Sequence, residues 1–143
     1  MKTKITIIAA MLLLSINAIA QVPQGMNYQA IVRDAGGNAI LNSPVCLRFT
    51  IHSGSGIGPI QYQESDTVTT NGFGLATIKV GMGTVIIGLF DTIPWNAGNQ
   101  YMQVEMDITG LCSTWVNMGA SQLLTVPYAM YAGSGITGHL ENV

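Results

Sequence analysis

The chain has 143 residues, of which 48% are hydrophobic and only 8% are charged, and its net charge at neutral pH is −2. This length is typical of one domain. With five basic residues, the sequence has no basic patch that could neutralise a run of phosphates, which argues against nucleic acid as a partner.

The N-terminus has the features of a secretory signal peptide. Lys2 and Lys4 precede an apolar run over residues 5–16, and residues 17–20 (NAIA) supply the small residues of an Ala-x-Ala cleavage site. This run is too short to cross the ~30 Å hydrocarbon core of a bilayer as a helix. We therefore expect cleavage after Ala20, export to the cell surface or beyond it, and no membrane span in the mature chain.

Loss of the signal peptide would make the mature chain poorer still in charge. Three basic and seven acidic residues would remain among 123 residues. An ordinary soluble surface carries roughly a quarter to a third charged residues. We therefore expect a surface of uncharged polar residues and glycine, with some apolar area covered by a partner.

Alternating apolar residues predict an all-β domain. The period-two pattern of a strand buried on one side recurs in residues 26–33, 45–52, 76–80 and 102–108. Turns rich in glycine and asparagine separate these segments. About seven short strands with frequent turns indicate a two-sheet β-sandwich, transthyretin-like or Ig-like, with no long amphipathic helix.

The alternation also predicts which side chains form the core. Within each strand, one set of apolar residues should face inward and the intervening polar residues should face solvent. The expected buried residues are Leu47, Phe49, Ile78, Val80, Val104 and Met106, and the expected exposed residues are Arg48, Lys79, Gln103 and Glu105.

Residues 85–95 are apolar but are interrupted by Gly88 and Pro94. We interpret them as a covering loop in which Phe90, Ile93 and Trp95 close one end of the core. The expected organisation is a signal peptide over residues 1–20, a sandwich over 21–132 and a flexible tail over 133–143.

A search for chemistry finds no catalytic or metal-binding pattern. The two histidines, His52 and His139, have no ligand partners at metal-site spacing and no nearby nucleophile motif, so we expect both to be solvated. The glycine-rich residues 54–58 lack the following helix that a phosphate-binding loop needs. We therefore predict no catalytic residue, no metal, no cofactor and no enzymatic activity.

The two cysteines, Cys46 and Cys112, leave two alternatives open. Disulfides are common in exported proteins, and a bond here would close a long loop. Cys46 is expected on the outward face of its strand and Cys112 in a loop, so a contact between them depends on the topology. Two free thiols are the other alternative.

Four aromatic residues suggest an alternative function. Side chains of Tyr62, Trp95, Tyr101 and Trp115 can stack on sugar rings, as in a carbohydrate-binding module. Aromatic residues on strands more often belong to the core or to cross-strand pairs. The core interpretation is therefore favoured, and a glycan partner stays as the alternative.

The C-terminal part contains an uncharged stretch over residues 123–135. Residues 122–126 can complete the last strand, and Pro127 then ends it, because proline lacks an N–H donor. Residues 128–132 can form about one helical turn, which is unstable alone. Tyr128, Met130 and Tyr131 must therefore pack on the chain's own sandwich or on neighbouring copies, and we expect them to contribute to self-association, most simply as a homotrimer.

Three motifs resemble a known family. Residues 24–38 (QGMNYQAIVRDAGGN), 69–75 (TTNGFGL) and 118–132 (MGASQLLTVPYAMYA) are similar to the N-terminal β-sandwich module of secreted Bacteroidota surface proteins with collagen-like or tail-fibre-like stalks. The resemblance implies a non-enzymatic structural or adhesive role, with other surface proteins or further copies as partners. The chain departs from that pattern by ending at Val143 without a stalk and by carrying two cysteines.

Overall fold

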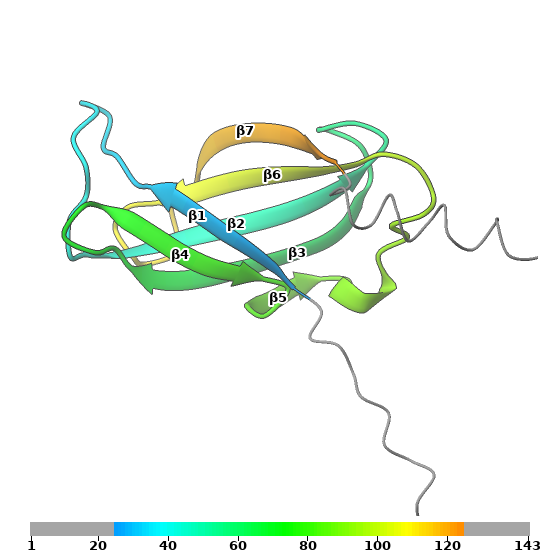
Figure 1. The fold of residues 1–143 in the computed structure, drawn as a ribbon, viewed down its shortest axis with the longest axis horizontal. Coiled ribbons are helices and arrows are strands. Elements are labelled where there is room, and N and C mark those ends of the chain that lie inside the picture. Colours follow the sequence, from blue (N-terminus) through cyan, green and yellow to red (C-terminus); the bar gives the residue numbers. More distant parts are fainter. Residues whose placement is uncertain (1–24, 125–143) are drawn as a thin grey trace, which may run out of the picture.

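The computed structural model describes residues 25–124, which form two antiparallel β-sheets (Figure 1). This confirms the predicted all-β, two-sheet fold. The predicted signal peptide and the residues proposed for self-association, Tyr128, Met130 and Tyr131, lie outside the described residues. So does His139.

Seven strands and one short 3-10 helix make up the described part of the chain. A five-stranded sheet has the strand order β5-β3-β2-β6-β7, and a two-stranded sheet pairs β1 with β4. The strands are β1 (Met26–Ile31), β2 (Pro44–Ser53), β3 (Ile60–Thr69), β4 (Leu75–Val80), β5 (Thr84–Ile87), β6 (Gln100–Asp107) and β7 (Val116–Leu123), and the helix η1 is Phe90–Thr92.

The core lies between the two sheets, centred on β2. Phe49 is fully buried, and the ring of Tyr28 on β1 packs edge-on against it with the centroids 4.9 Å apart. All six residues that the alternation placed in the core are buried: Leu47, Phe49, Ile78, Val80, Val104 and Met106. The predicted register is therefore confirmed, because a shift by one residue would have moved every one of them to the other face.

The polar side chains predicted to face solvent are less exposed than expected on the five-stranded sheet. Lys79 on β4 is exposed as expected, whereas Arg48, Gln103 and Glu105 are half-buried. The prediction of full exposure was wrong because Arg48 and Glu105 pair with each other, Arg48 also lies over the Trp115 ring, and Gln103 contacts His52.

The segment after β4 was predicted as a loop and is partly a strand. Residues Thr84–Ile87 form β5, which pairs with β3 at the edge of the sheet. Phe90 and Ile93 are buried as predicted. The ring of Phe90 packs edge-on against the ring of Tyr62, with the centroids 5.2 Å apart. Trp95 contacts Phe90 but is 41% exposed, so it covers this end of the core only in part.

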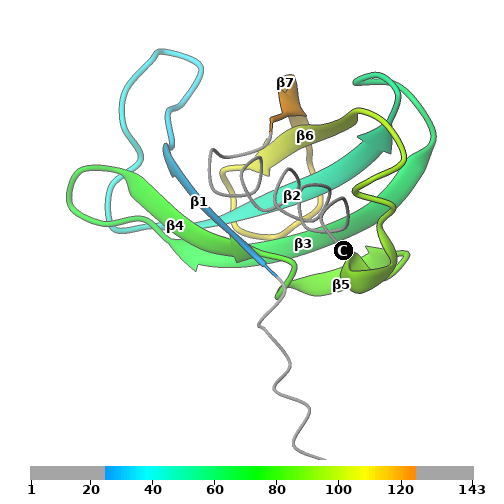
Figure 2. The same cartoon turned by 45° about the vertical axis from the view of Figure 1, so that its right-hand side comes forward.

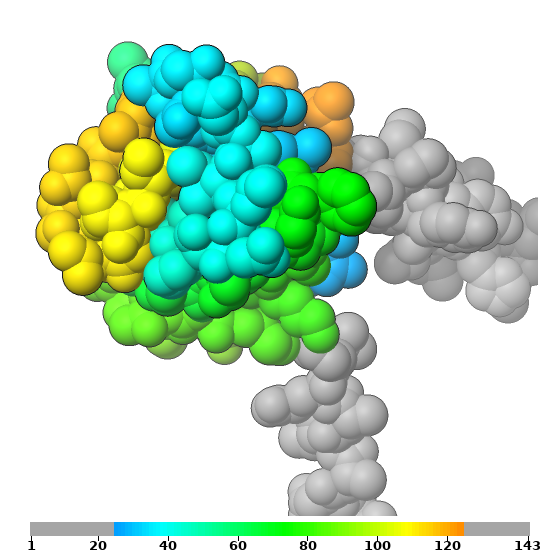
Figure 3. All heavy atoms as spheres, turned by 90° about the vertical axis from the view of Figure 1, so that its left-hand side faces the viewer, coloured from blue at the N-terminus to red at the C-terminus, as the bar shows by residue number. Residues whose placement is uncertain are grey.

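Three connections gather at one end of the sandwich. Figure 3 shows this end, where the β1–β2 connection, the β3–β4 turn and the β6–β7 connection lie side by side. In the β3–β4 turn, the side-chain oxygen of Asn71 accepts hydrogen bonds from the backbone N–H of Phe73 and of Leu75. Gly74 has φ +78°, which an L-residue rarely adopts, so this turn needs glycine there.

Candidate functional site

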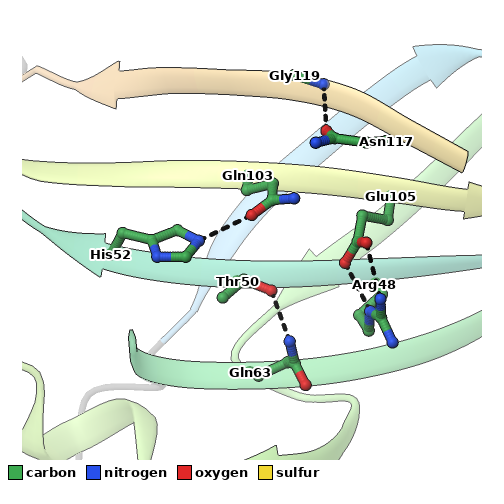
Figure 4. Close-up of polar contacts among 8 residues, drawn as sticks. All are labelled: Arg48, Thr50, His52, Gln63, Gln103, Glu105, Asn117 and Gly119. Carbon is green, nitrogen blue, oxygen red and sulfur yellow. Dashed lines mark hydrogen bonds and ion pairs between the residues drawn. The ribbon is translucent and has the colours of Figure 1, made fainter. Parts of the chain in front are cut away.

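The outer face of the five-stranded sheet carries a layer of polar side chains (Figure 4). Alternation along β2 places Arg48, Thr50 and His52 on the face opposite Leu47 and Phe49. Their neighbours on β3 and β6 are also polar. We call this set the outer polar face, and it consists of Arg48, Thr50, His52, Gln63, Gln103 and Glu105.

An ion pair forms the centre of one half of the outer polar face. Arg48 donates two hydrogen bonds to Glu105, from Nε to Oε2 and from a terminal nitrogen to Oε1, both 2.7 Å long. The guanidinium carbon also lies 4.5 Å from the centroid of the Trp115 ring. This geometry matches the planar fork of arginine to a carboxylate and adds a cation–π contact. Both charges are therefore satisfied within the domain.

His52 is buried in the other half of this face, where solvation had been predicted. Its Nδ1 lies 2.7 Å from the carbonyl oxygen of Gly58, and its Nε2 lies 2.8 Å from Oε1 of Gln103. The glycine-rich connection after β2 folds back over the ring, which the strand pattern alone could not reveal. Since both ring nitrogens have partners, His52 holds this loop to the sheet and is not free to bind a ligand.

The cysteines meet at the end of the same face. Cys46 and Cys112 form a disulfide with their Cα atoms 5.3 Å apart, and it closes 66 residues of chain. Cys46 points outward from the core, as predicted, but the β6–β7 connection covers it completely. The topology thus brings together the two residues whose contact the sequence left open.

Asp107 organises the connection that carries Cys112. Its carboxylate accepts hydrogen bonds from the backbone N–H and hydroxyl of Thr109 and from the N–H groups of Ser113 and Thr114, over 2.6–3.1 Å. These hydrogen bonds hold the pKa of Asp107 well below its usual value, and the bond from the Thr109 hydroxyl has the largest effect.

The lowered pKa of Asp107 predicts a pH dependence. Because the folded-state pKa lies below the unfolded one, the carboxylate stabilises the fold above the ordinary aspartate value near 4, and this contribution is lost as the pH falls further. Asp107→Asn should therefore lower the denaturation midpoint at pH 7 and flatten its decline towards pH 3. The exposed Asp91→Asn is the control and should keep the wild-type profile. Parallel profiles for Asp107→Asn and the wild type would contradict this role.

The four aromatic residues considered for sugar stacking do not form one strip. Tyr62 is fully buried and donates a 2.7 Å hydrogen bond from its hydroxyl to Glu64, so it cannot meet a ligand. Tyr101 and Trp115 are half-buried on the outer face, and Trp95 lies beside the core residue Phe90. The predicted set is therefore divided between different parts of the surface.

Glu64 is a buried acid that the sequence reasoning did not identify. Besides the Tyr62 hydroxyl, its carboxylate accepts hydrogen bonds of 2.8 Å from the N–H groups of Gly81 and Gly83. These bonds fix the turn between β4 and β5. Burial and the neighbouring charge of Glu64 raise the pKa of Asp66. Glu64 is fully engaged by neutral donors, so we assign it a structural role.

A groove lies on the inner side of the sandwich. The β1–β4 sheet lies across β2 and β3, and it leaves β7 and part of β6 uncovered (Figures 1 and 2). Three adjoining hollows of about 240, 300 and 340 Å³ follow this gap. We call them together the open groove, and its large apolar lining residues include Tyr28, Met102, Val104, Met106, Val116 and Met118.

Two features expose apolar side chains and backbone polar groups at the open groove. Val116 and Met118 are 56% and 57% exposed on the inner face of β7, where a sandwich would normally bury such residues. In addition, β1 pairs with β4 on one side and with no strand on the other among residues 25–124. Because β4 lies next to β3, the free edge of β1 is the one beside the groove. Arg33 and Asp34 mark its far end, near the β6–β7 connection.

Comparison with known proteins identifies one family. A family model described as "Domain of unknown function (DUF8740)" matches residues 27–119, and no curated protein and no solved structure matches the chain. In residues 25–124, no helix is long and apolar enough to cross a membrane. The same residues contain no group of three or more histidine, cysteine or acidic side chains that could hold a metal ion.

Proposed function

The chain belongs to the DUF8740 family of domains of unknown function, and from that premise we propose that it is a non-enzymatic structural module of a secreted or cell-surface protein. Its activity is association with other protein chains, in the first place with further copies of itself. Adhesion between surface proteins, as the three family-like motifs imply, is the setting that we propose for this association.

The open groove is the observation that carries the proposal. Exposed, contiguous apolar surface of this kind marks interaction sites on soluble proteins, and a free strand edge offers unpaired N–H and C=O groups to an incoming chain. The groove floor between Met102 and Met118 contains no charged residue. An uncharged polypeptide segment fits these properties better than a small polar substrate does.

Two further features support an extracellular setting. The N-terminal 20 residues have the composition and cleavage site of a signal peptide. The Cys46–Cys112 disulfide belongs to an oxidising compartment, because cytosolic thiols are kept reduced. The carbohydrate-binding alternative has less support, since Tyr62 is buried and the other three aromatic residues do not share one surface.

A pair of methionines provides a matched test of self-association. Met118 in the groove and Met82 in the β4–β5 turn are both 57% exposed, so glutamate is equally compatible with the fold at either site. Light scattering on the mature chain should detect an oligomer, a homotrimer in the simplest case. Met118→Glu should weaken association at least tenfold, because a carboxylate loses its hydration in an apolar contact.

The Met82→Glu variant should associate as the wild type does. If the mature chain has the mass of a single copy at every concentration that its solubility allows, the self-association proposal is wrong. An equal effect of both substitutions would instead locate the contact outside the open groove.

A further inference from the structure

We infer that the open groove receives residues 125–132 (TVPYAMYA) from a second copy of the chain. This inference rests on the proposed function and names the segment that makes the contact. It also gives a role to the uncharged stretch near the C-terminus, whose partner the sequence left undetermined.

β7 ends at one end of the open groove. Leu123 and Leu124 line a further hollow of about 400 Å³ together with Met26 and Trp95, at the end of the groove where β1 begins. The chain therefore leaves the described domain at the mouth of the groove. In an assembly of copies packed about a symmetry axis near this mouth, each departing segment lies close to a neighbouring groove.

The dimensions and chemistry of the segment also match the groove. The six residues of β1 extend over about 20 Å, and eight extended residues reach about 26 Å. Residues 125–132 carry no charge and contain Tyr128, Met130 and Tyr131. In an extended segment Tyr128 and Met130 share one face, and this face complements a floor of methionine and valine, where a charged segment would lose its hydration without compensation.

The direction of the chain favours a second copy over the same one. To enter its own groove, the chain must reverse direction directly after Leu124. Directly after β7, Leu124, Thr125 and Val126 are not among the residues that favour tight turns, and Pro127 is the first such residue that the chain reaches. Thr125 and Val126 are β-branched, and the residue before Pro127 is biased towards an extended backbone. These preferences favour a segment that continues in the direction of β7 over one that reverses into its own groove.

A buried oxygen at the mouth supports the arrival of a polypeptide there. Gln100 is 3% exposed, and its Nε2 donates a hydrogen bond to the carbonyl oxygen of Pro94. Its Oε1 has no hydrogen-bond partner. Among residues 25–124 it is the one buried side-chain nitrogen or oxygen without such a partner. Since Gln100 lines the hollow at the mouth, a rotation of its side chain would present this acceptor to a backbone N–H of an entering segment.

A complementation experiment tests the inference with two variants of the full mature chain. The first, Met118→Glu, blocks the groove and keeps the segment. The second combines Tyr128→Ser, Met130→Ser and Tyr131→Ser, which removes the apolar side chains of the segment and keeps the groove. Each variant alone should associate at least tenfold more weakly than the wild type. Their mixture should form a one-to-one complex, because one supplies the groove and the other the segment.

Ile136→Ser, outside residues 125–132, is the control and should associate as the wild type does. If the segment variant still forms the wild-type oligomer, the occupant is another surface and this inference fails, while the proposed self-association stands. If both variants are single copies and their mixture forms no complex, the segment does not enter the groove of a second copy. A wild-type chain that never associates would refute the proposed function itself.

Discussion

Phe49→Ala is expected to lower the free energy of unfolding by about 3–5 kcal/mol, the range for removing a buried aromatic ring from a packed core. Phe49 is fully buried in the middle of β2, the central strand of the five-stranded sheet, and Tyr28 of the second sheet packs against its ring. The substitution therefore removes packing between the two sheets. Chemical denaturation monitored by circular dichroism measures the effect.

Phe73 provides the matched control for this prediction. It lies in the β3–β4 turn and is 81% exposed, so Phe73→Ala should change the free energy of unfolding by less than about 0.5 kcal/mol. Equal effects of the two substitutions would mean that the inner face of β2 does not form the core.

Removal of the disulfide is expected to cost about 4 kcal/mol, because the bond closes 66 residues and restricts the unfolded chain. Alanine is the suitable replacement for both Cys46 and Cys112, since Cys46 is fully buried and a hydroxyl there would need a partner. A reductant should destabilise the wild type by a similar amount and leave the double alanine variant unchanged.

Mass spectrometry under non-reducing conditions gives an independent check. The wild type should show no reactive thiol before reduction and two after it. Two free thiols in the native exported chain, or denaturation midpoints that do not respond to the reductant, would contradict a stabilising disulfide.

The fold class and the centre of the core could be predicted because they depend on short-range patterns. Leu47 and Phe49 alternate with Arg48 and Thr50, and only one pairing register buries the first two together. Turn residues such as Asn71 act through hydrogen bonds to their own neighbours, so the β3–β4 turn was also visible in the sequence.

Two strands were missed because their side chains do not follow the simple rule. On β3, Glu64 and Asp66 occupy the same inward-facing series as Tyr62, which hides the alternation. The Glu64 carboxylate is stable at such a position only because the Tyr62 hydroxyl and backbone N–H groups of the β4–β5 turn donate hydrogen bonds to it. No pattern in the sequence reveals these donors. On β5, four consecutive exposed residues give no signal of a buried face.

The sequence by itself determined the all-β class, the register of the central strand and a low-charge chain with an uncharged C-terminal stretch. Tertiary structure decided the disulfide, the burial of His52 and the open groove. Each of these depends on how elements distant in the chain cover one another: a loop folds over Cys46, another over His52, and the β1–β4 sheet is too narrow to cover β7. Alternation specifies which face of a strand is apolar, but only the arrangement of the sheets specifies how much of that face remains open.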